Sequence, residues 1–375
     1  MYEEETMRKP LLLVLISLML MGAPLPAKGN KTRIAKRNAS DILNPKTFNG
    51  RSIGTNSTEE NLTWSLPKLE VTEDHVAEYL SGVLSTRLIP AAYIVAMIIG
   101  VPTNSIILGF LSIKTKTFST AILYCSLAVS DLLFLLTLTF KVHYHLNGNN
   151  WVFGEAACRV VTACFYGNAY CSIHTLMCIA VKRYVAIVHP FTYKSLPKRR
   201  CTACSSLAVW AVFIIAMVPE LLIRQSYHLP GLGITTCHDV LPVEDQSLSL
   251  LLYYKLALTF LGFVPSFLVT AFTYGSILRQ LSKSDTDWVH YIKASTLVFI
   301  IFTVCFTPSC VIHFAHYVTL YTSGQDHFYV YYSVTVCLCG LHSCLDPFLF
   351  SFMSKTTRSK RTFVRLRGKN ISIST

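Results

Sequence analysis

Charged residues are scarce in this chain, and that scarcity excludes most classes of protein. They make up 14% of the 375 residues, whereas hydrophobic residues make up 52%. Soluble domains carry about 25% charged residues, so the composition excludes an ordinary soluble protein. The sequence also lacks the internal repeats expected of a transporter. We find no nucleophile–base set that would indicate an enzyme.

Long apolar stretches occupy most of the chain instead. A bilayer core about 30 Å thick requires roughly 20 apolar residues per helix, and only helices or closed barrels can cross it. We therefore predict an all-α membrane protein, a seven-transmembrane helix bundle over residues 88–353. The predicted spans are Ile89–Leu111, Ala121–Phe140, Arg159–Val188, Cys204–Leu222, Leu252–Leu278, Ala294–His316 and Phe328–Met353.

Lysine and arginine are sparse in every second loop. The net charge of +13 gathers after spans one, three, five and seven, all on one side of the membrane if the spans alternate. This asymmetry predicts an extracellular N-terminus, a cytoplasmic tail over residues 354–375 and a plasma-membrane location. The basic surface then faces anionic lipid, and we predict no nucleic-acid partner.

The N-terminal region contains an apolar run too short to span a membrane. Leu11–Met21 follows Arg8 and Lys9, which predicts a signal peptide over residues 1–28. Residues 29–87 are too poor in apolar side chains to form a core, so we predict a disordered extracellular tail. Three sequons in this tail predict glycosylation at Asn38, Asn56 and Asn61.

Cysteines are almost absent from the predicted extracellular loops. Of the 13 cysteines most lie inside spans, where a thiol behaves as a small apolar group. Cys158 and Cys237 are the two that face the oxidising compartment. A pair there predicts one disulfide, joining the outer end of span three to the loop before span five.

A few polar and helix-breaking residues lie deep in the spans. Ionisable groups inside a bilayer are costly and indicate function, which applies to Asp131 and Asp346. With Ser172 they either hold a sodium ion or form structural hydrogen bonds, and the sequence leaves both open; we predict no other metal and no cofactor. Buried prolines, among them Pro308 and Pro347, predict bent helices that can pivot between two states.

These landmarks together resemble the rhodopsin-like G-protein-coupled receptors over about residues 85–355. The resemblance implies a heterotrimeric G protein as partner and a role in activation for Asp131, Arg183, Pro308, Asp346 and Pro347. The matching motifs, in chain order, are Asn104, Leu127–Asp131, Lys182-Arg183-Tyr184, Trp210, Pro265, Cys305–Pro308 and Asp346–Phe350.

Loop motifs narrow the resemblance to the protease-activated receptors. The runs are Ile234–Val240, His145–Glu155 and Phe165–Asn168, while His189–Tyr193 and Met353–Lys355 look like the type 3 branch. In this family a protease cuts the extracellular tail, and the new amino terminus acts as a tethered agonist. A tethered ligand acts at high effective concentration, so modest affinity suffices.

Two bonds in the tail are candidates for that cut. We favour Lys46–Thr47, which resembles the type 3 site and would make Thr47, Phe48, Asn49 and Gly50 the tethered ligand, with thrombin as the protease. The alternative is Arg51–Ser52, which suits a trypsin-like protease.

The resemblance also implies two sets of contacts. The acidic pair Glu59 and Glu60 corresponds to the segment that docks on thrombin, and His238 and Asp239 are the expected loop contacts of the ligand. Three positions depart from the family pattern: Lys182 replaces an acid, His342 an asparagine and Phe350 a tyrosine. His342 puts sodium binding in doubt.

These departures keep two other functions open. The chain is either a signalling receptor or a cofactor that captures a protease for another receptor, with which it would form a hetero-dimer. It could alternatively respond to a diffusible ligand. Signalling from the chain expressed alone separates the first two, and deletion of residues 31–60 tests the third.

Overall fold

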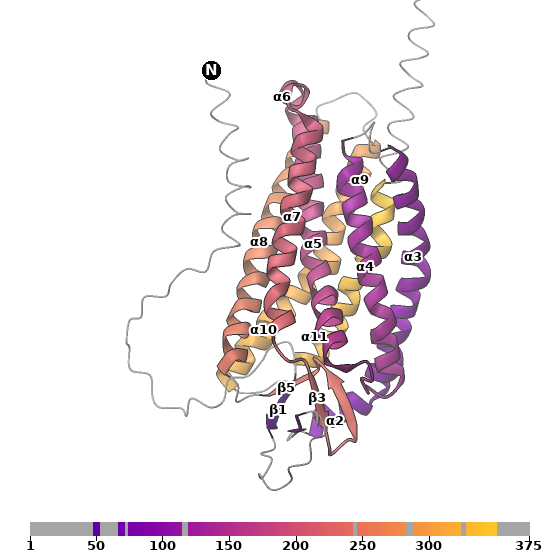
Figure 1. Ribbon diagram of the computed structural model, residues 1–375. Coiled ribbons are helices and arrows are strands. Elements are labelled where there is room, and N and C mark those ends of the chain that lie inside the picture. Colours follow the sequence, from indigo (N-terminus) through magenta and orange to yellow (C-terminus); the bar gives the residue numbers. More distant parts are fainter. Residues whose placement is uncertain are drawn as a thin grey trace, which may run out of the picture.

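The computed structural model describes residues 48–52, 67–71, 74–114, 119–242, 246–282, 289–323 and 328–350. Within these ranges, seven helices are long and apolar enough to cross a membrane. Figure 1 shows them side by side as one bundle. The predicted fold class is confirmed, and all seven predicted spans correspond to helices.

Several helices are composed of more than one element. The first span joins α2 (Asp74–Ser81), η1 (Leu84–Leu88) and α3 (Ile89–Lys114), so it begins earlier than the predicted Ile89. The others are α4 (Ala121–Leu146), α5 (Gly154–Val188), α7 (Lys198–Leu222), α8 (Gln246–Leu281), then α9 (Val289–Ile300) with η2 (Ile301–Phe306) and α10 (Thr307–Ser323), and α11 (Phe328–Gly340) continued by residues 342–350. The short α6 (Pro190–Ser195) follows α5.

The bundle exposes apolar side chains and buries polar ones, as a membrane protein does. Ile98, Ile106 and Leu207 are each about two-thirds exposed on the outer surface, whereas Asp131 and Ser172 are fully buried. Because lipid replaces water around the spans, an apolar exterior costs little there.

Two motif residues link helices within the bundle. The Asn104 side chain donates a hydrogen bond to the carbonyl of Ser343 at 2.8 Å, which joins α3 to the seventh span. Trp210 donates to the Ser126 hydroxyl at 2.7 Å, which joins α7 to α4. These sequence landmarks are therefore packing contacts between helices.

All the described strands lie at one end of the bundle, the end opposite α6 in Figure 1. The charge pattern predicts this end to be extracellular, and we call it the outer end. Strands β3 (Ser226–Leu229) and β4 (Ile234–Cys237) form a hairpin. A second sheet has the order β2 (Leu69–Glu70), β1 (Phe48–Ser52) and β5 (Val240–Pro242).

Candidate functional site

The loop between α7 and α8 is fixed to α5 by a disulfide. Cys158, in the first turns of α5, is bonded to Cys237 at the end of β4, and both are fully buried. The predicted pair is therefore joined in the structure. The bond fixes the position of the two residues that follow in the chain, His238 and Asp239.

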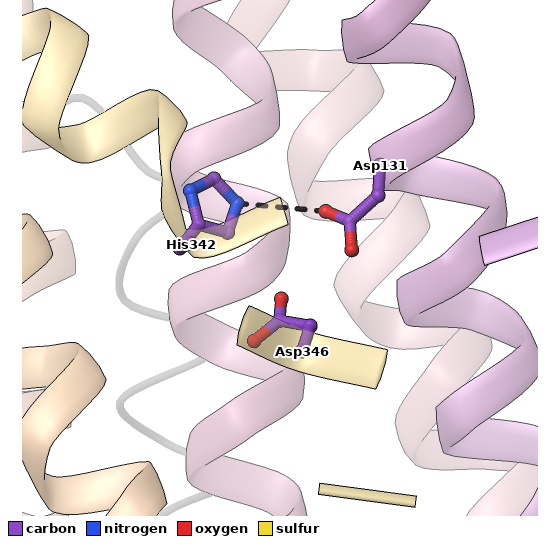
Figure 2. Close-up of side chains that lie close together, drawn as sticks. All are labelled: Asp131, His342 and Asp346. Carbon is purple, nitrogen blue, oxygen red and sulfur yellow. Dashed lines mark ion pairs between the residues drawn. The ribbon is translucent and has the colours of Figure 1, made fainter. Parts of the chain in front are cut away.

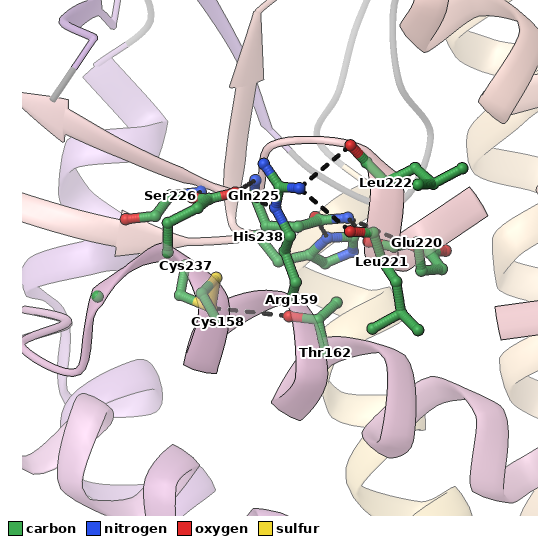
Figure 3. A network of polar contacts seen from close by, with 12 residues as sticks. Cys158, Arg159, Thr162, Glu220, Leu221, Leu222, Gln225, Ser226, Cys237 and His238 are labelled. Atoms are coloured by element: carbon green, nitrogen blue, oxygen red, sulfur yellow. Dashed lines mark hydrogen bonds and ion pairs between the residues drawn. A yellow bond between two sulfur atoms is a disulfide. The ribbon is translucent and has the colours of Figure 1, made fainter. Parts of the chain in front are cut away.

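A charged network supports the same loop (Figure 3). The Glu155 carboxylate accepts hydrogen bonds from the backbone N–H groups of Gln225 and Ser226, each at 2.9 Å. It also accepts from Arg159 at 2.6 Å, and Arg159 donates to the last carbonyls of α7, those of Leu221 and Leu222. Glu155 and Arg159 together thus connect α5 to α7 and to the start of β3.

The two predicted ligand contacts have different surroundings. His238 is completely buried, has a positive φ of 72° and donates from Nδ1 to the Gln225 side chain at 2.6 Å. It lies within the loop, where it stabilises the turn that follows β4. Asp239 is also buried but is 7% exposed, so of the two it is the stronger proposal for direct contact with a ligand.

Asp239 connects the loop to two helices of the bundle. Its Oδ2 accepts from the Tyr144 hydroxyl at 2.5 Å, and its Oδ1 accepts from the Tyr329 hydroxyl at 2.7 Å. Tyr144 is on α4 and Tyr329 on α11, so the carboxylate bridges two spans. The buried Lys141 lies nearby, its Nζ 5.6 Å from the ring centroids of both Tyr144 and Phe165.

The sheet at the outer end includes part of the predicted tail. Phe48, Asn49 and Gly50 of β1 pair in parallel with Val240, Leu241 and Pro242 of β5. Arg51 and Ser52 pair antiparallel with Glu70 and Leu69 of β2. Three predicted ligand residues are thereby paired with the loop strand that follows Asp239.

An apolar cavity of about 60 Å³ lies inside the bundle. Its lining comes from α4, α5, α8, α10 and the seventh span, and includes Tyr332, His313 and Phe306. His342 also lines it, so the cavity extends towards the polar centre of the bundle.

That polar centre contains two carboxylates and an imidazole (Figure 2). The His342 Nε2 lies 3.5 Å from an oxygen of Asp131, and the atoms offered by Asp131, His342 and Asp346 all lie within 4.8 Å of one another. All three residues are buried, and neither carboxylate has a hydrogen-bond partner among the described residues. Ser172 is buried beside Asn168, which donates to Ser130 at 2.8 Å.

This cluster is suited to a cation. His342 Nδ1 donates to the carbonyl of Cys339, which leaves Nε2 directed at Asp131. An imidazole oriented in this way by a backbone carbonyl is a common arrangement at cation sites. Asp131, His342 and Asp346 would hold a cation here; its charge would offset the two carboxylates.

The inner end contains one of the predicted activation residues, Arg183. Arg183 is 5% exposed and donates to the Tyr124 hydroxyl at 2.6 Å, linking α5 to α4. Lys182, in the place of the usual acid, instead donates to Ser119 and Thr202 at 3.0 and 2.6 Å. The sixth span loosens into η2, which ends two residues before Pro308. The Thr307 hydroxyl donates to the carbonyl of Phe302 at 2.9 Å there.

Several predicted residues lie outside the described ranges. They are the cleavage residues Lys46 and Thr47, the acidic pair Glu59 and Glu60, and the glycosylation sites Asn38, Asn56 and Asn61. The signal peptide and the cytoplasmic tail also lie outside them.

The chain matches a known family along most of its bundle. Residues 104–350 match the family described as 7 transmembrane receptor (rhodopsin family). The chain is 46% identical to proteinase-activated receptor 3 of Rattus norvegicus over 293 residues, covering 77% of this chain and 80% of that receptor. The chain belongs to the proteinase-activated receptors. The recognition made from the loop motifs is confirmed.

Other relatives of this receptor give the same result. It is 45% identical to proteinase-activated receptor 3 of Homo sapiens, covering 76% of each chain. It is 37% identical to proteinase-activated receptor 2 of Mus musculus, covering 76% of this chain and 73% of that receptor. As a member of this family, the chain is a receptor of the cell membrane. These relatives are receptors and not enzymes.

Sequence reasoning missed three residues of this receptor's outer end. Lys141, Tyr144 and Tyr329 surround Asp239, and none had been singled out. Lys141 lies one residue beyond Phe140, the predicted end of span two, so it was not recognised as a charge inside the membrane, although the helix continues to Leu146. The tyrosines carried none, since tyrosine at the end of a span commonly contacts the membrane interface.

Proposed function

We propose that this receptor is a G-protein-coupled receptor activated when an extracellular serine protease cuts its N-terminal tail and unmasks a tethered agonist. The observation that carries the proposal is the pairing of β1 with β5, which joins predicted ligand residues to the strand following Asp239. Thrombin is the proposed protease and Lys46–Thr47 the proposed bond.

The strand register supports Asp239 as the partner of the new amino terminus. Phe48 pairs with Val240, and the residues that precede these two in the chain are Thr47 and Asp239. Parallel strands advance together by about 3.3 Å per residue. Cleavage before Thr47 creates an ammonium group one residue before Phe48. The residue one before Val240 is Asp239, whose carboxylate is the complementary charge.

The contacts of Asp239 supply a route from ligand to helices. An ammonium group that binds the carboxylate competes with the hydroxyls of Tyr144 and Tyr329, which now hold it. Weakening those bonds frees α11 relative to α4. The bundle then pivots near Pro308 and Pro347, and Arg183 leaves Tyr124 so that a G protein can dock at the inner end.

Protease treatment of cells expressing this chain alone tests the proposal. Sequencing the new terminus and recording calcium together should give cleavage at Lys46–Thr47 followed by signalling. Lys46→Gln should abolish both thrombin responses, and Arg51→Gln should abolish neither. Cleavage without any G-protein signal would instead support a cofactor that presents the protease to another receptor.

A further inference from the structure

The two candidate cleavage bonds differ in their relation to β1. Arg51 and Ser52 both belong to the strand and pair with Glu70 and Leu69 of β2. The Lys46–Thr47 bond precedes the first residue of β1, Phe48. The Arg51–Ser52 bond therefore lies inside a paired strand.

A protease must bind the main chain around the bond that it cuts. Peptides recognised in an extended form offer their free backbone N–H and C=O groups to a partner as a new strand. At Arg51–Ser52 those groups are committed, because the residues of the bond pair with β2 and the preceding Asn49 and Gly50 pair with β5. The edge of β1 that faces β2 is therefore unavailable at this bond unless β1 leaves the sheet.

The two flanking strands are firmly held, so they cannot simply move aside. Leu69 of β2 is 1% exposed, and Val240 and Leu241 of β5 are fully buried. The start of β2 is also bridged to the loop, where Lys68 pairs with His228. Unpairing of β1 itself is therefore the route by which Arg51–Ser52 becomes accessible.

We propose that β2 and β5 form a strand-binding groove, occupied by Phe48–Ser52 of the same chain, that shields the Arg51–Ser52 bond from trypsin-like proteases. The groove thus acts against cleavage at Arg51–Ser52, the alternative to the proposed Lys46–Thr47 bond. A cut ahead of Phe48 also leaves the strand in its groove, whereas a cut at Arg51 divides it. The inference rests on the proposed cleavage of the tail, although its test requires no signalling.

The test compares trypsin cleavage at Arg51 in the full-length receptor on cells with cleavage in a free peptide of residues 44–56. Mass spectrometry of the new Ser52 terminus measures the rate at limiting protease, where cleavage follows the population of the open form. Glu70→Pro removes a backbone N–H opposite Arg51 without changing the residues around the bond. Glu70→Ala is the matched control, because it removes the same charge and keeps the N–H.

We expect the peptide and the Glu70→Pro receptor to be cut at Arg51 on the order of tenfold faster than the unaltered receptor, the factor given by loss of one or two net hydrogen bonds. Glu70→Ala should match the unaltered receptor. A second variant, Asn49→Pro, should also be cut faster when normalised to a peptide carrying the same change. Equal rates for receptor and peptide, or for the proline and alanine variants, would overturn the proposal even if thrombin signalling is intact.

Discussion

At the scale of single residues, Asp239 connects the outer loop to the bundle. In the proposed mechanism, the negative charge of Asp239 binds the ammonium group of the new amino terminus. A neutral side chain of the same shape would bind it less tightly. We predict that Asp239→Asn weakens the calcium response to protease by about tenfold to a hundredfold, as expected for loss of a hydrogen bond to a charged group. The rate of tail cleavage should not change. Calcium dose–response curves with parallel sequencing of the tail provide the measurement.

Tyr329→Phe is the control for that change. It removes one hydrogen bond to Asp239 and keeps the carboxylate, so the receptor should respond at the same or a lower protease concentration than the unaltered receptor. A normal response from Asp239→Asn, with cleavage intact, would refute the role of the charge.

Asp131, His342 and Asp346 make a second prediction at this scale. Two ionised carboxylates buried without hydrogen-bond partners repel each other, and a cation bound between them would relieve that repulsion. We predict that sodium chloride raises the melting temperature of the purified receptor by a few degrees over choline chloride, as about 1 kcal/mol would do in a domain of this size. Asp346→Asn should abolish the difference.

The opposite result would also be informative. If the unaltered receptor ignores sodium and Asp346→Asn is the more stable protein in both salts, the cluster binds no sodium and the two carboxylates destabilise the fold. Ser130→Ala is a suitable control, because Ser130 accepts from Asn168 and forms no hydrogen bond with either carboxylate.

At the scale of elements, the sixth span contains the clearest mechanical feature. Its backbone loosens at η2, directly before Pro308. Since proline cannot donate a backbone hydrogen bond, the helix bends most easily there. We predict that Pro308→Ala reduces the maximal calcium response several-fold, while surface expression and tail cleavage persist. Pro102→Ala, in α3, is the matched control and should signal normally.

The elements also show where sequence reasoning succeeds and where it stops. Hydropathy predicts the spans because each helix satisfies its own backbone hydrogen bonds, so length and composition suffice. Strands β1 and β2 went unpredicted, since a strand depends on its partner and the partner of Phe48 is Val240, far along the chain. The disulfide was predictable because two cysteines faced the outside. The contacts of Asp239 with Tyr144 and Tyr329 were not, since they depend on how α4 and α11 pack.

At the scale of the whole molecule, charge determines how the receptor meets its protease. The chain carries a net charge of +13, whereas the tail contains the adjacent acidic residues Glu59 and Glu60. We predict that replacing both with alanine slows thrombin cleavage by about threefold to tenfold at low ionic strength, through loss of electrostatic steering. The effect should fade as salt rises.

Thrombin digestion followed at several salt concentrations measures this effect. Replacement of Glu73 with alanine is the control, because Glu73 follows β2 in the chain. Glu3 and Glu4 are unsuitable, since they lie in the predicted signal peptide. A double variant that slows cleavage equally at all salt concentrations would argue for direct contact in place of steering.

The groove between β2 and β5 has a pharmacological consequence. A soluble peptide that imitates the tethered agonist would find its place already taken by Phe48–Ser52, and it would have to evict a strand attached to the same molecule. Peptide mimetics should therefore be weak drugs for this receptor.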